Sequence, residues 1–361
     1  MTHRPRYGRK ADPDSLVVVS VRDTDWAGVR LHVVTGKGGT GKTTVAAALA
    51  LALASNGKPV LLMEVEGRQG IAQLFDTPPL PYEERKVAVA PGTPATPGGD
   101  VYALAADPES ALIEYLEIFY NLKHTGRTLT RLGLVDFVTT IAPGLRDVLL
   151  TGKAVEATRR RVKGHHLYDA VVMDAPPTGR IGRFLNVATE VSGLAKVGPI
   201  RGHADTVQGV IHSPQTAVHF VTVLEEMPVQ ETLDGLAELR GLAGGGLQLG
   251  AVIINMVRPT GLTDGQLVTA ARGKLDVHEL ALGLKAAGID GSLGQGSDSD
   301  VAVALAAELG EHSLEVLSQR EHRRMLADAG QPCYELPLIT DGMDLAGLYR
   351  LAAALKEQGA A

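Results

Sequence analysis

The fold of this chain follows from one stretch of its sequence, Gly36-Lys37-Gly38-Gly39-Thr40-Gly41-Lys42-Thr43-Thr44. The stretch satisfies the pattern G-x-x-x-x-G-K-[ST], whose glycines let backbone N–H groups curl around phosphate groups. Lys42 is placed to reach the β- and γ-phosphates, and the hydroxyl of Thr43 to take a position on Mg²⁺. We therefore expect the whole stretch to hold the phosphates of ATP or ADP together with Mg²⁺.

The segments on either side of the loop supply the structure that this chemistry needs. Leu31–Thr35 is a short apolar run that predicts a buried strand, and Thr43–Ser55 is an Ala/Leu-rich run that predicts a helix. The helix should end at Asn56-Gly57, and Val60–Met63 predicts the next strand. This order of elements is a βαβ unit, which implies parallel pairing and directs the positive end of the helix dipole at the phosphates.

The remaining sequence continues this alternation and adds two long helical segments. We expect a loop at Ala88–Asp100, which is rich in Pro and Gly, and a helical stretch from about Asp107 to His166 that ends in a solvated basic run, Arg159–Lys163. The predicted fold class is α/β: a doubly wound, mostly parallel sheet of the P-loop NTPase type at 29–361. Helical insertions interrupt it at about 106–167 and 258–330, and a flexible arm precedes it at 1–28. Further strands are predicted at Val101–Ala105, Ala170–Met173, Ala217–Val223, Ala251–Ile254 and Tyr334–Leu338, and a closing helix at Leu345–Leu355.

Composition limits the functions that this fold could serve. The net charge of −6 has both signs mixed along the chain, which gives no case for a nucleic-acid partner. The single cysteine, Cys333, excludes a disulfide within the chain and a multi-thiolate metal site, and it fits a reducing cytoplasm. The longest apolar run, Val45–Ala54, is half the length that a membrane span needs. We expect a cytoplasmic protein without a direct membrane span.

A second acidic position completes the predicted site. Asp174 directly follows the apolar strand at 170–173, and the run Asp174-Ala175-Pro176-Pro177-Thr178-Gly179 then turns away from it. An Asp at the carboxyl end of a strand beside the phosphate-loop strand is where a Walker B acid sits and holds Mg²⁺, directly or through water. Asp174 and Thr43 are therefore the predicted metal-binding residues.

The motif D-A-P-P-T-G at 174–179 resembles the D-T-A-P-T-G switch of the ArsA-type anion-pump ATPases and of their relatives that target tail-anchored membrane proteins. The resemblance covers about residues 30–355 and is nearest to an actinobacterial branch in which two paralogues can act as a pair. It implies ATP hydrolysis with Mg²⁺, a homodimer or heterodimer, and a protein client that the sequence leaves unknown. The segments that match in order are Lys58–Phe75, Ile141–Leu145, Phe220–Thr232, Ala251–Asn255 and Glu335–Leu338.

The resemblance also implies roles for single residues. The loop G-K-G-G-T-G-K-T-T has the deviant Walker A form, in which the first lysine, here Lys37, crosses a dimer interface to the nucleotide of the partner. Asn255 stands where these families use an Asn against the adenine, and Pro337 lies in a second loop near the base. Glu66 aligns with the Asp that positions the attacking water. Catalytic roles are therefore expected for Lys37, Lys42, Glu66 and Asp174.

The sequence departs from the family pattern in ways that keep other functions open. Glu66 is one methylene longer than the usual Asp, and Arg68-Gln69 stand where a His is usual. A weakly active, nucleotide-binding scaffold subunit beside an active paralogue is therefore an alternative to an ATPase that drives a helical client-binding surface. A partition or positioning ATPase is a second alternative, which the two helical insertions disfavour. The apolar face Leu112/Tyr115/Leu116/Phe119 is interpreted as packing within the first insertion rather than as a client groove.

Overall fold

The computed structural model describes residues 25–361 except 93, 95, 121–142, 187–198, 243–246 and 290–297. Most of the predicted N-terminal arm, residues 1–24, therefore lies outside the described residues. The last part of that predicted arm packs on the core: Trp26 is buried, and its ring meets the ring of His219 edge-on at 4.9 Å. The backbone N–H of Asp25 also donates to the carbonyl of Gly359.

An eight-stranded sheet forms the centre of the molecule, in the order β10-β9-β8-β1-β7-β2-β4-β3. All neighbouring strands pair in parallel except β3, which runs antiparallel to β4 at one edge. This confirms the predicted α/β class with a mostly parallel sheet. The strands are β1 (Leu31–Gly36), β2 (Val60–Glu64), β3 (Arg85–Val89), β4 (Asp100–Ala105), β7 (Ala170–Asp174), β8 (Thr216–Thr222), β9 (Gln248–Val257) and β10 (Cys333–Pro337).

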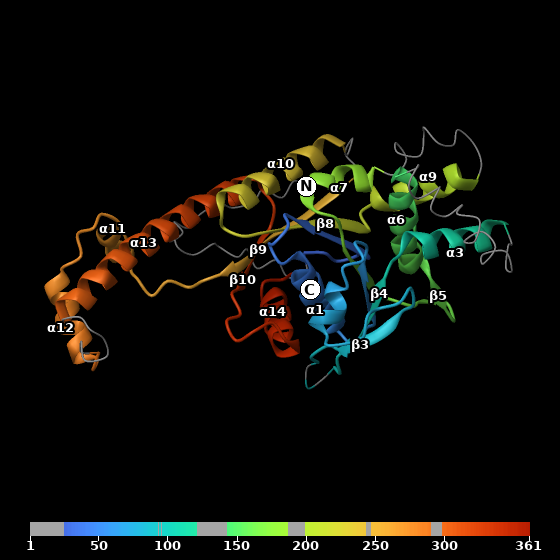
Figure 1. Cartoon of the computed structure of the whole chain (residues 1–361). Coiled ribbons are helices and arrows are strands. Elements are labelled where there is room, and N and C mark those ends of the chain that lie inside the picture. Colours follow the sequence, from blue (N-terminus) through green and yellow to red (C-terminus); the bar gives the residue numbers. More distant parts are fainter. Residues whose placement is uncertain are drawn as a thin grey trace, which may run out of the picture.

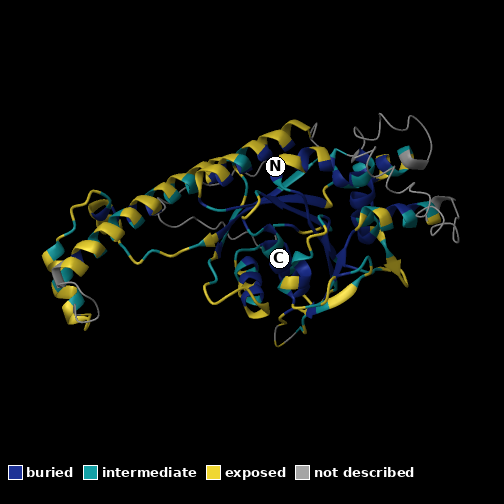
Figure 2. Cartoon of the chain, viewed as in Figure 1, coloured by how far each residue is buried: buried dark blue, intermediate teal, exposed yellow. Residues whose placement is uncertain are grey.

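Helices cover both faces of the sheet, so the fold is doubly wound (Figure 1). One face carries α1 (Lys42–Ala54), α2 (Gly70–Leu74) and α14 (Leu345–Glu357). The other face carries α6 (Pro143–Arg159), α7 (Thr178–Leu185), α9 (Pro199–Ile211) and α10 (Glu226–Leu242). The helical segment predicted at 106–167 therefore includes one helix, α6, that packs directly on a face of the sheet. Figure 2 shows the strands and the helix segments that face them as buried, and the buried side chains form one cluster on each face of the sheet.

The helix α1 is apolar on all sides because it is covered on all sides. It lies between the sheet and α14, and its Ala and Leu side chains are almost all buried. A helix without a polar face is stable only when packing surrounds it. The small alanine side chains let α14 approach α1 closely. This packing holds α1 firmly, with its first residue, Lys42, directly after the phosphate loop.

The predicted helical stretch 107–166 ends earlier than expected. It contains α3 (Pro108–Tyr120) and α6, after which the chain forms a two-stranded hairpin, β5 (Arg161–Val162) and β6 (His165–His166). Lys163 and Gly164 have φ angles of 51° and 86°, the left-handed values that a tight hairpin turn requires. Predicting a helix through His166 was therefore wrong.

Arg160 also departs from the predicted solvated helix end. Its guanidinium binds Glu84 at 2.7 Å and Glu156 at 2.5 Å, which ties the end of α6 to the segment before β3. Glu84 precedes a strand that the sequence did not predict, because β3 is short, lies at a sheet edge and begins with two exposed charged residues, Arg85 and Lys86. The loop predicted at 88–100 is correspondingly shorter, since β3 takes its first residues and β4 its last.

The face of α3 that was predicted to pack internally does so where the structure describes it. Leu112 and Tyr115 are buried against Leu149 of α6, and Leu116 is partly buried beside them. The side chain of Phe119 lies outside the described residues. The apolar pattern of α3 therefore attaches it to α6.

A long helical arm projects from the side of the molecule that carries β10 (Figure 1). It consists of α13 (Asp298–Asp328), with α11 (Asp264–Ala271) and α12 (Val277–Ala286) packed along its outer half. Its surface is mostly exposed in Figure 2, and only the inner end, at Leu326, reaches the main core. In the described part of the chain, no helix is long and apolar enough to cross a membrane.

A pair of histidines is buried in the middle of the sheet. His32 of β1 and His219 of β8 stack at a ring distance of 5.3 Å, with His32 Nδ1 3.1 Å from His219 Nε2. The backbone N–H of Ala251 donates to His219 Nδ1 at 3.1 Å, where an irregularity in the β8–β9 ladder leaves that donor free. His219 must therefore carry its proton on Nε2 and donate it to His32, so both imidazoles are neutral in this arrangement.

Burial lowers the pKa of His32 to about 4, and burial also lowers the pKa of His219 well below its ordinary value. The unfolded chain binds protons on both imidazoles below about pH 6.5, whereas the folded chain does not. The free energy of unfolding should therefore fall as the pH drops from about 6.5 towards 4. For His32 alone the loss by pH 5 is about 2 kcal/mol.

Exchanging His32 for Gln should make stability less dependent on pH, because the carboxamide does not titrate. We expect His32→Gln to be less stable than the parent at pH 7.5 but to lose less of its unfolding free energy between pH 7 and 5. Urea denaturation across this range measures both quantities. His165→Gln is the control, since this imidazole is solvated in the folded and unfolded chain. Equal slopes for His32→Gln and the parent would contradict the neutral buried pair.

Candidate functional site

The phosphate loop connects β1 to α1 at the carboxyl edge of the sheet. Gly36 must be a glycine because a Cβ there would lie 2.4 Å from the carbonyl oxygen of Val221 on β8. Gly41 has a φ of 80° and caps α1, and a Cβ there would lie 2.5 Å from Nδ2 of Asn255. No described side chain caps this helix end, so its first N–H groups remain available to an anion.

Four of the predicted residues come together at this helix end from three chain segments. Lys42 Nζ lies 3.1 Å from Glu66 Oε2 and 3.4 Å from Asp174 Oδ1. The hydroxyl of Thr43 donates to Asp174 Oδ2 at 2.7 Å. Lys42 and Asp174 are both buried, so their charges attract each other in surroundings that screen them little. The ammonium of Lys42 is thus held by two carboxylates at the position where phosphates would lie.

The position of Asp174 makes the negative charge of its carboxylate unfavourable. Burial raises its pKa, and the charge of nearby Glu64 raises it further, while Lys42 and the Thr43 hydroxyl oppose the shift. A carboxylate in this setting gains from a second cation. Asp174 and Thr43 supply hard oxygen donors close together, the kind of ligand that Mg²⁺ binds.

The protein groups alone do not make a complete metal site. No group of three or more His, Cys, Asp or Glu side chains in the described residues could hold a metal ion. Mg²⁺ keeps octahedral geometry and is commonly bound by one or two protein oxygens together with phosphates and water. Asp174 and Thr43 therefore fit a Mg²⁺ that arrives with a nucleotide.

Glu64 is a site residue for which the sequence predicted no role. It is 2% exposed, pairs in register with Asp174 across β2 and β7, and accepts hydrogen bonds from the N–H groups of Gln69 at 2.5 Å and Ile71 at 3.1 Å. The side chain of Gln69 in turn bonds both backbone groups of Leu80. Glu64 thereby fixes the loop that carries Glu66. An acid as the last residue of an otherwise apolar buried strand was the signal available in the sequence.

Glu66 lies in that loop with its side chain mostly covered. Besides Lys42 it meets the guanidinium of Arg68 at 3.6 Å, which extends from the surface. Gly67 between the two has a φ of 68°, and Gln69 has a φ of 57°, so the loop turns sharply twice. The carboxylate of Glu66 is therefore held beside Lys42 by charge, on a loop whose backbone is held by Glu64.

The two residues predicted to contact the adenine lie at the ends of neighbouring strands. Asn255 of β9 is buried and donates from Nδ2 to the carbonyl of Thr40 at 2.9 Å, so its amide supports the phosphate loop. Pro337 is exposed at the end of β10 and pairs in register with Val257. Met256, which follows Asn255 in β9, has a φ of 58°, an unusual value for a residue other than glycine. This residue is 42% exposed. Contact of these residues with a base stays a prediction.

Lys37 turns back towards its own chain. Its Nζ lies 2.5 Å from Glu231 Oε1 of α10, and the two side chains are 28% and 38% exposed. Of the remaining loop residues, Gly38 and Gly39 are exposed, Thr44 is half-buried, and the Thr40 hydroxyl bonds the carbonyl of Lys37 at 2.8 Å. The backbone of Lys37 is thus fixed by the loop, while its side chain remains at the surface.

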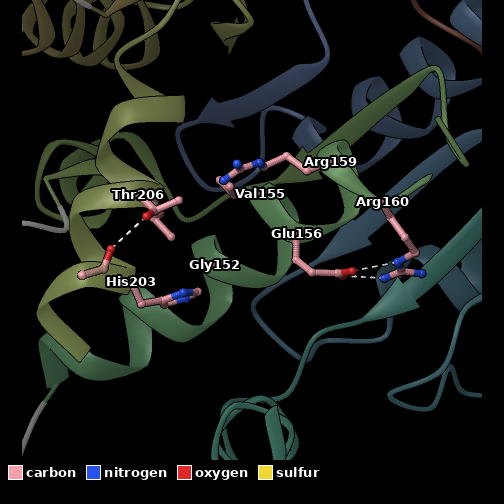
Figure 3. Close-up of a pocket in the computed structure, with 9 residues that line it drawn as sticks. Gly152, Val155, Glu156, Arg159, Arg160, His203 and Thr206 are labelled. Carbon is pink, nitrogen blue, oxygen red and sulfur yellow. Dashed lines mark hydrogen bonds and ion pairs between the residues drawn. The ribbon is translucent and has the colours of Figure 1, made fainter. Parts of the chain in front are cut away.

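A separate cleft lies between α6 and α9 and contains none of the predicted site residues. Its volume is about 550 Å³, and Val155, Val207 and two glycines form much of its wall. Figure 3 shows Glu156 and Arg160 paired at one side, Arg159 directed away from them, and the ring of His203 next to Gly152. Burial lowers the pKa of His203. The described residues that line this cleft show no hydrogen-bonded set of nucleophile, acid and base.

Comparison with known proteins shows the family of the chain. The anion-transporting ATPase family matches residues 29–211. ATPase BagA of Mycobacterium tuberculosis is 51% identical over 334 residues, which cover 92% of this chain and 94% of that protein. An arsenical pump-driving ATPase of Escherichia coli is 26% identical over 68% of this chain and 42% of its own length. ATPase get3 of Schizosaccharomyces japonicus is 27% identical over 46% of this chain. The chain belongs to the ArsA-type, anion-transporting family of P-loop ATPases.

Proposed function

We propose that this chain binds and hydrolyses Mg-ATP as one subunit of a dimer and couples its nucleotide state to a helical surface that binds a protein client. The observation that supports this most strongly is the convergence of Lys42, Thr43, Glu66 and Asp174 at the open end of α1. Phosphate binding and hydrolysis need a cation, a metal-binding oxygen pair and an acid that orients water. The cytoplasm remains the predicted compartment.

The contacts suggest how nucleotide binding rearranges the site. Phosphates at the end of α1 would draw Lys42 away from Glu66 and Asp174. Asp174 would then bind Mg²⁺ with Thr43, and Mg²⁺ would supply the positive charge that neutralises the phosphates. Glu66, released from Lys42, would be free to accept a hydrogen bond from the attacking water. Before ATP binds, the ion pair with Lys42 keeps Glu66 occupied.

A weakly active scaffold subunit is the second candidate function, and Glu66 is the observation that favours it. Its carboxylate is one methylene further from the backbone than that of an Asp, and Arg68 competes for it. Both features would place it poorly for a water molecule. An active paralogue would then supply most of the turnover.

Lys42→Ala should bind Mg-ATP at least about tenfold more weakly than the parent. The variant loses charged hydrogen bonds to phosphate, each worth roughly 1.5–3 kcal/mol, and leaves Asp174 and Glu66 to repel the nucleotide. Isothermal titration calorimetry measures the affinity, with Lys58→Ala as a control, because Lys58 is an exposed lysine paired with Asp169. Unchanged affinity in a folded Lys42→Ala protein would remove the site assignment.

Glu66→Gln should abolish turnover while ATP affinity is kept or improved, because the amide keeps the size of the side chain but not its charge. Steady-state phosphate release and calorimetry on the same preparation separate these effects. Glu66→Asp is the matched variant: a higher kcat than the parent would support the weakly active subunit, and a lower one the full ATPase. Parental turnover in Glu66→Gln would rule out a role for Glu66 in hydrolysis.

Lys37→Ala should bind nucleotide almost normally, because Lys42 serves the phosphates within its own subunit. It should lose turnover by a factor on the order of 10³, the low end for a charge supplied across an interface. The decisive measurement mixes Lys37→Ala with Lys42→Ala. Lys37 of the second subunit can serve the ATP held by the first, so the mixture should recover activity that neither variant has alone.

Two outcomes refine or contradict this expectation. Recovery only with a paralogue, and not between copies of this chain, would identify a heterodimer. If folded proteins show no recovery in either mixture, Lys37 acts within its own subunit or takes no part in hydrolysis.

A further inference from the structure

The ion pair between Lys37 and Glu231 involves the residue that the proposed function assigns to the partner's nucleotide. Lys37 Nζ and Glu231 Oε1 are 2.5 Å apart within one chain. A lysine that donates to its own α10 cannot at the same time reach across an interface. The inference that follows rests on the proposed function, since it concerns how Lys37 becomes available.

Glu231 is presented by a firmly held part of α10. Its neighbours Val229 and Thr232 are buried, and the Thr232 hydroxyl bonds the carbonyl of Pro228 one turn earlier at 2.8 Å. The backbone of Lys37 is held as well, by the hydrogen bond from the Thr40 hydroxyl to its carbonyl. Because both backbones are held, the ion pair can open by rotation of the two side chains, without unfolding either segment.

The strength of the pair suits a restraint that nucleotide can overcome. Both side chains are partly exposed, and an ion pair of this kind shifts an equilibrium by at most about fivefold. A triphosphate offers several negative charges in a closed interface where water is excluded, which attracts an ammonium more strongly than one solvated carboxylate does. Lys37 would therefore exchange Glu231 for phosphate only when a nucleotide-bound partner is present.

We infer that Glu231 is a positioning residue that holds Lys37 within its own subunit until a nucleotide-bound partner is present. It thereby raises the concentration of ATP-bound partner that is needed for closure, in which two subunits meet and Lys37 of each reaches the nucleotide of the other. It acts through Lys37 and takes no direct part in hydrolysis. Its removal should favour closure without changing the rate of hydrolysis inside a closed dimer.

The first test measures assembly with Mg²⁺ and the β,γ-imido analogue of ATP. Glu231→Gln keeps the size of the side chain and removes its charge. Since each dimer opens two such pairs, the protein concentration for half-maximal dimerisation in sedimentation velocity should fall by about twofold to 25-fold. Turnover at saturating protein and ATP should equal that of the parent. Asp234→Asn is the control on the same helix, where Asp234 bonds Gln230, and it should assemble like the parent. Glu231→Asp, which keeps the charge, should also assemble like the parent.

The second test needs no dimer. Acetic anhydride labelling of the nucleotide-free chain, read by mass spectrometry, should modify Lys37 a few times faster in Glu231→Gln than in the parent, with Lys58 as internal reference. Unchanged labelling of Lys37, or weaker assembly of Glu231→Gln, would overturn the inference. The latter result would mean that Glu231 prepares Lys37 for closure instead of holding it back.

The Lys37→Ala variant separates failure of this inference from failure of the proposed function. Suppose that Lys37→Ala does not dimerise with the ATP analogue while Glu231→Gln dimerises at the same concentration as the parent. Lys37 then acts across the interface, but Glu231 does not restrain it. If Lys37→Ala closes and turns over normally, the role of Lys37 in the proposed function is itself wrong. The double variant Lys37→Ala/Glu231→Gln should match Lys37→Ala, because Glu231 acts only through the lysine.

Discussion

The ion pairs of Lys42 with Asp174 and Glu66 join the three segments on which the site depends. They link the start of α1, the end of β7 and the loop after β2, which are far apart in the sequence. Two acids share one ammonium in a buried setting, so each partner is stabilised by the others and none can leave without a replacement charge. In the proposed function, a nucleotide with Mg²⁺ would supply such replacements, negative for Lys42 and positive for Asp174.

The backbone around this cluster is set by close approaches that only glycine permits. Gly36 lets β8 pass next to the start of the loop, and Gly41 lets Asn255 reach the carbonyl of Thr40. These contacts connect the phosphate loop to β8 and β9, while Glu64 connects the loop after β2, the switch loop that carries Glu66, to β2. The phosphate loop is thus supported on the β8 side of β1 by these contacts, and on the β7 side by the bonds of Lys42 and Thr43 to Asp174. Such support favours tight phosphate binding, because little ordering remains to be done when the ligand arrives.

The structure consists of a tightly packed core and of exposed elements attached to it. The sheet, α1 and α14 form a core that is mostly aliphatic, and the His32–His219 pair is among its buried polar groups. Lys37, Glu231 and the arm of α11–α13 lie at the surface, where partners and a client could meet them (Figure 2). A rigid nucleotide site with exposed elements attached is the arrangement that a nucleotide-controlled switch requires.

The sequence by itself determined the phosphate loop, the parallel α/β sheet and the Asp at the end of β7, because these depend on local patterns of glycine, apolar runs and strand ends. It did not predict β3 or the β5–β6 hairpin, since an edge strand and a two-residue turn carry little hydrophobic signal. Tertiary structure alone decided that Glu64 holds the switch loop, that Asn255 supports Thr40, and that Lys37 pairs with Glu231. Each of these contacts joins a side chain of one element to a backbone or side-chain group of another segment. Their partners follow from how strands and helices are placed in space, which no local pattern of residues encodes.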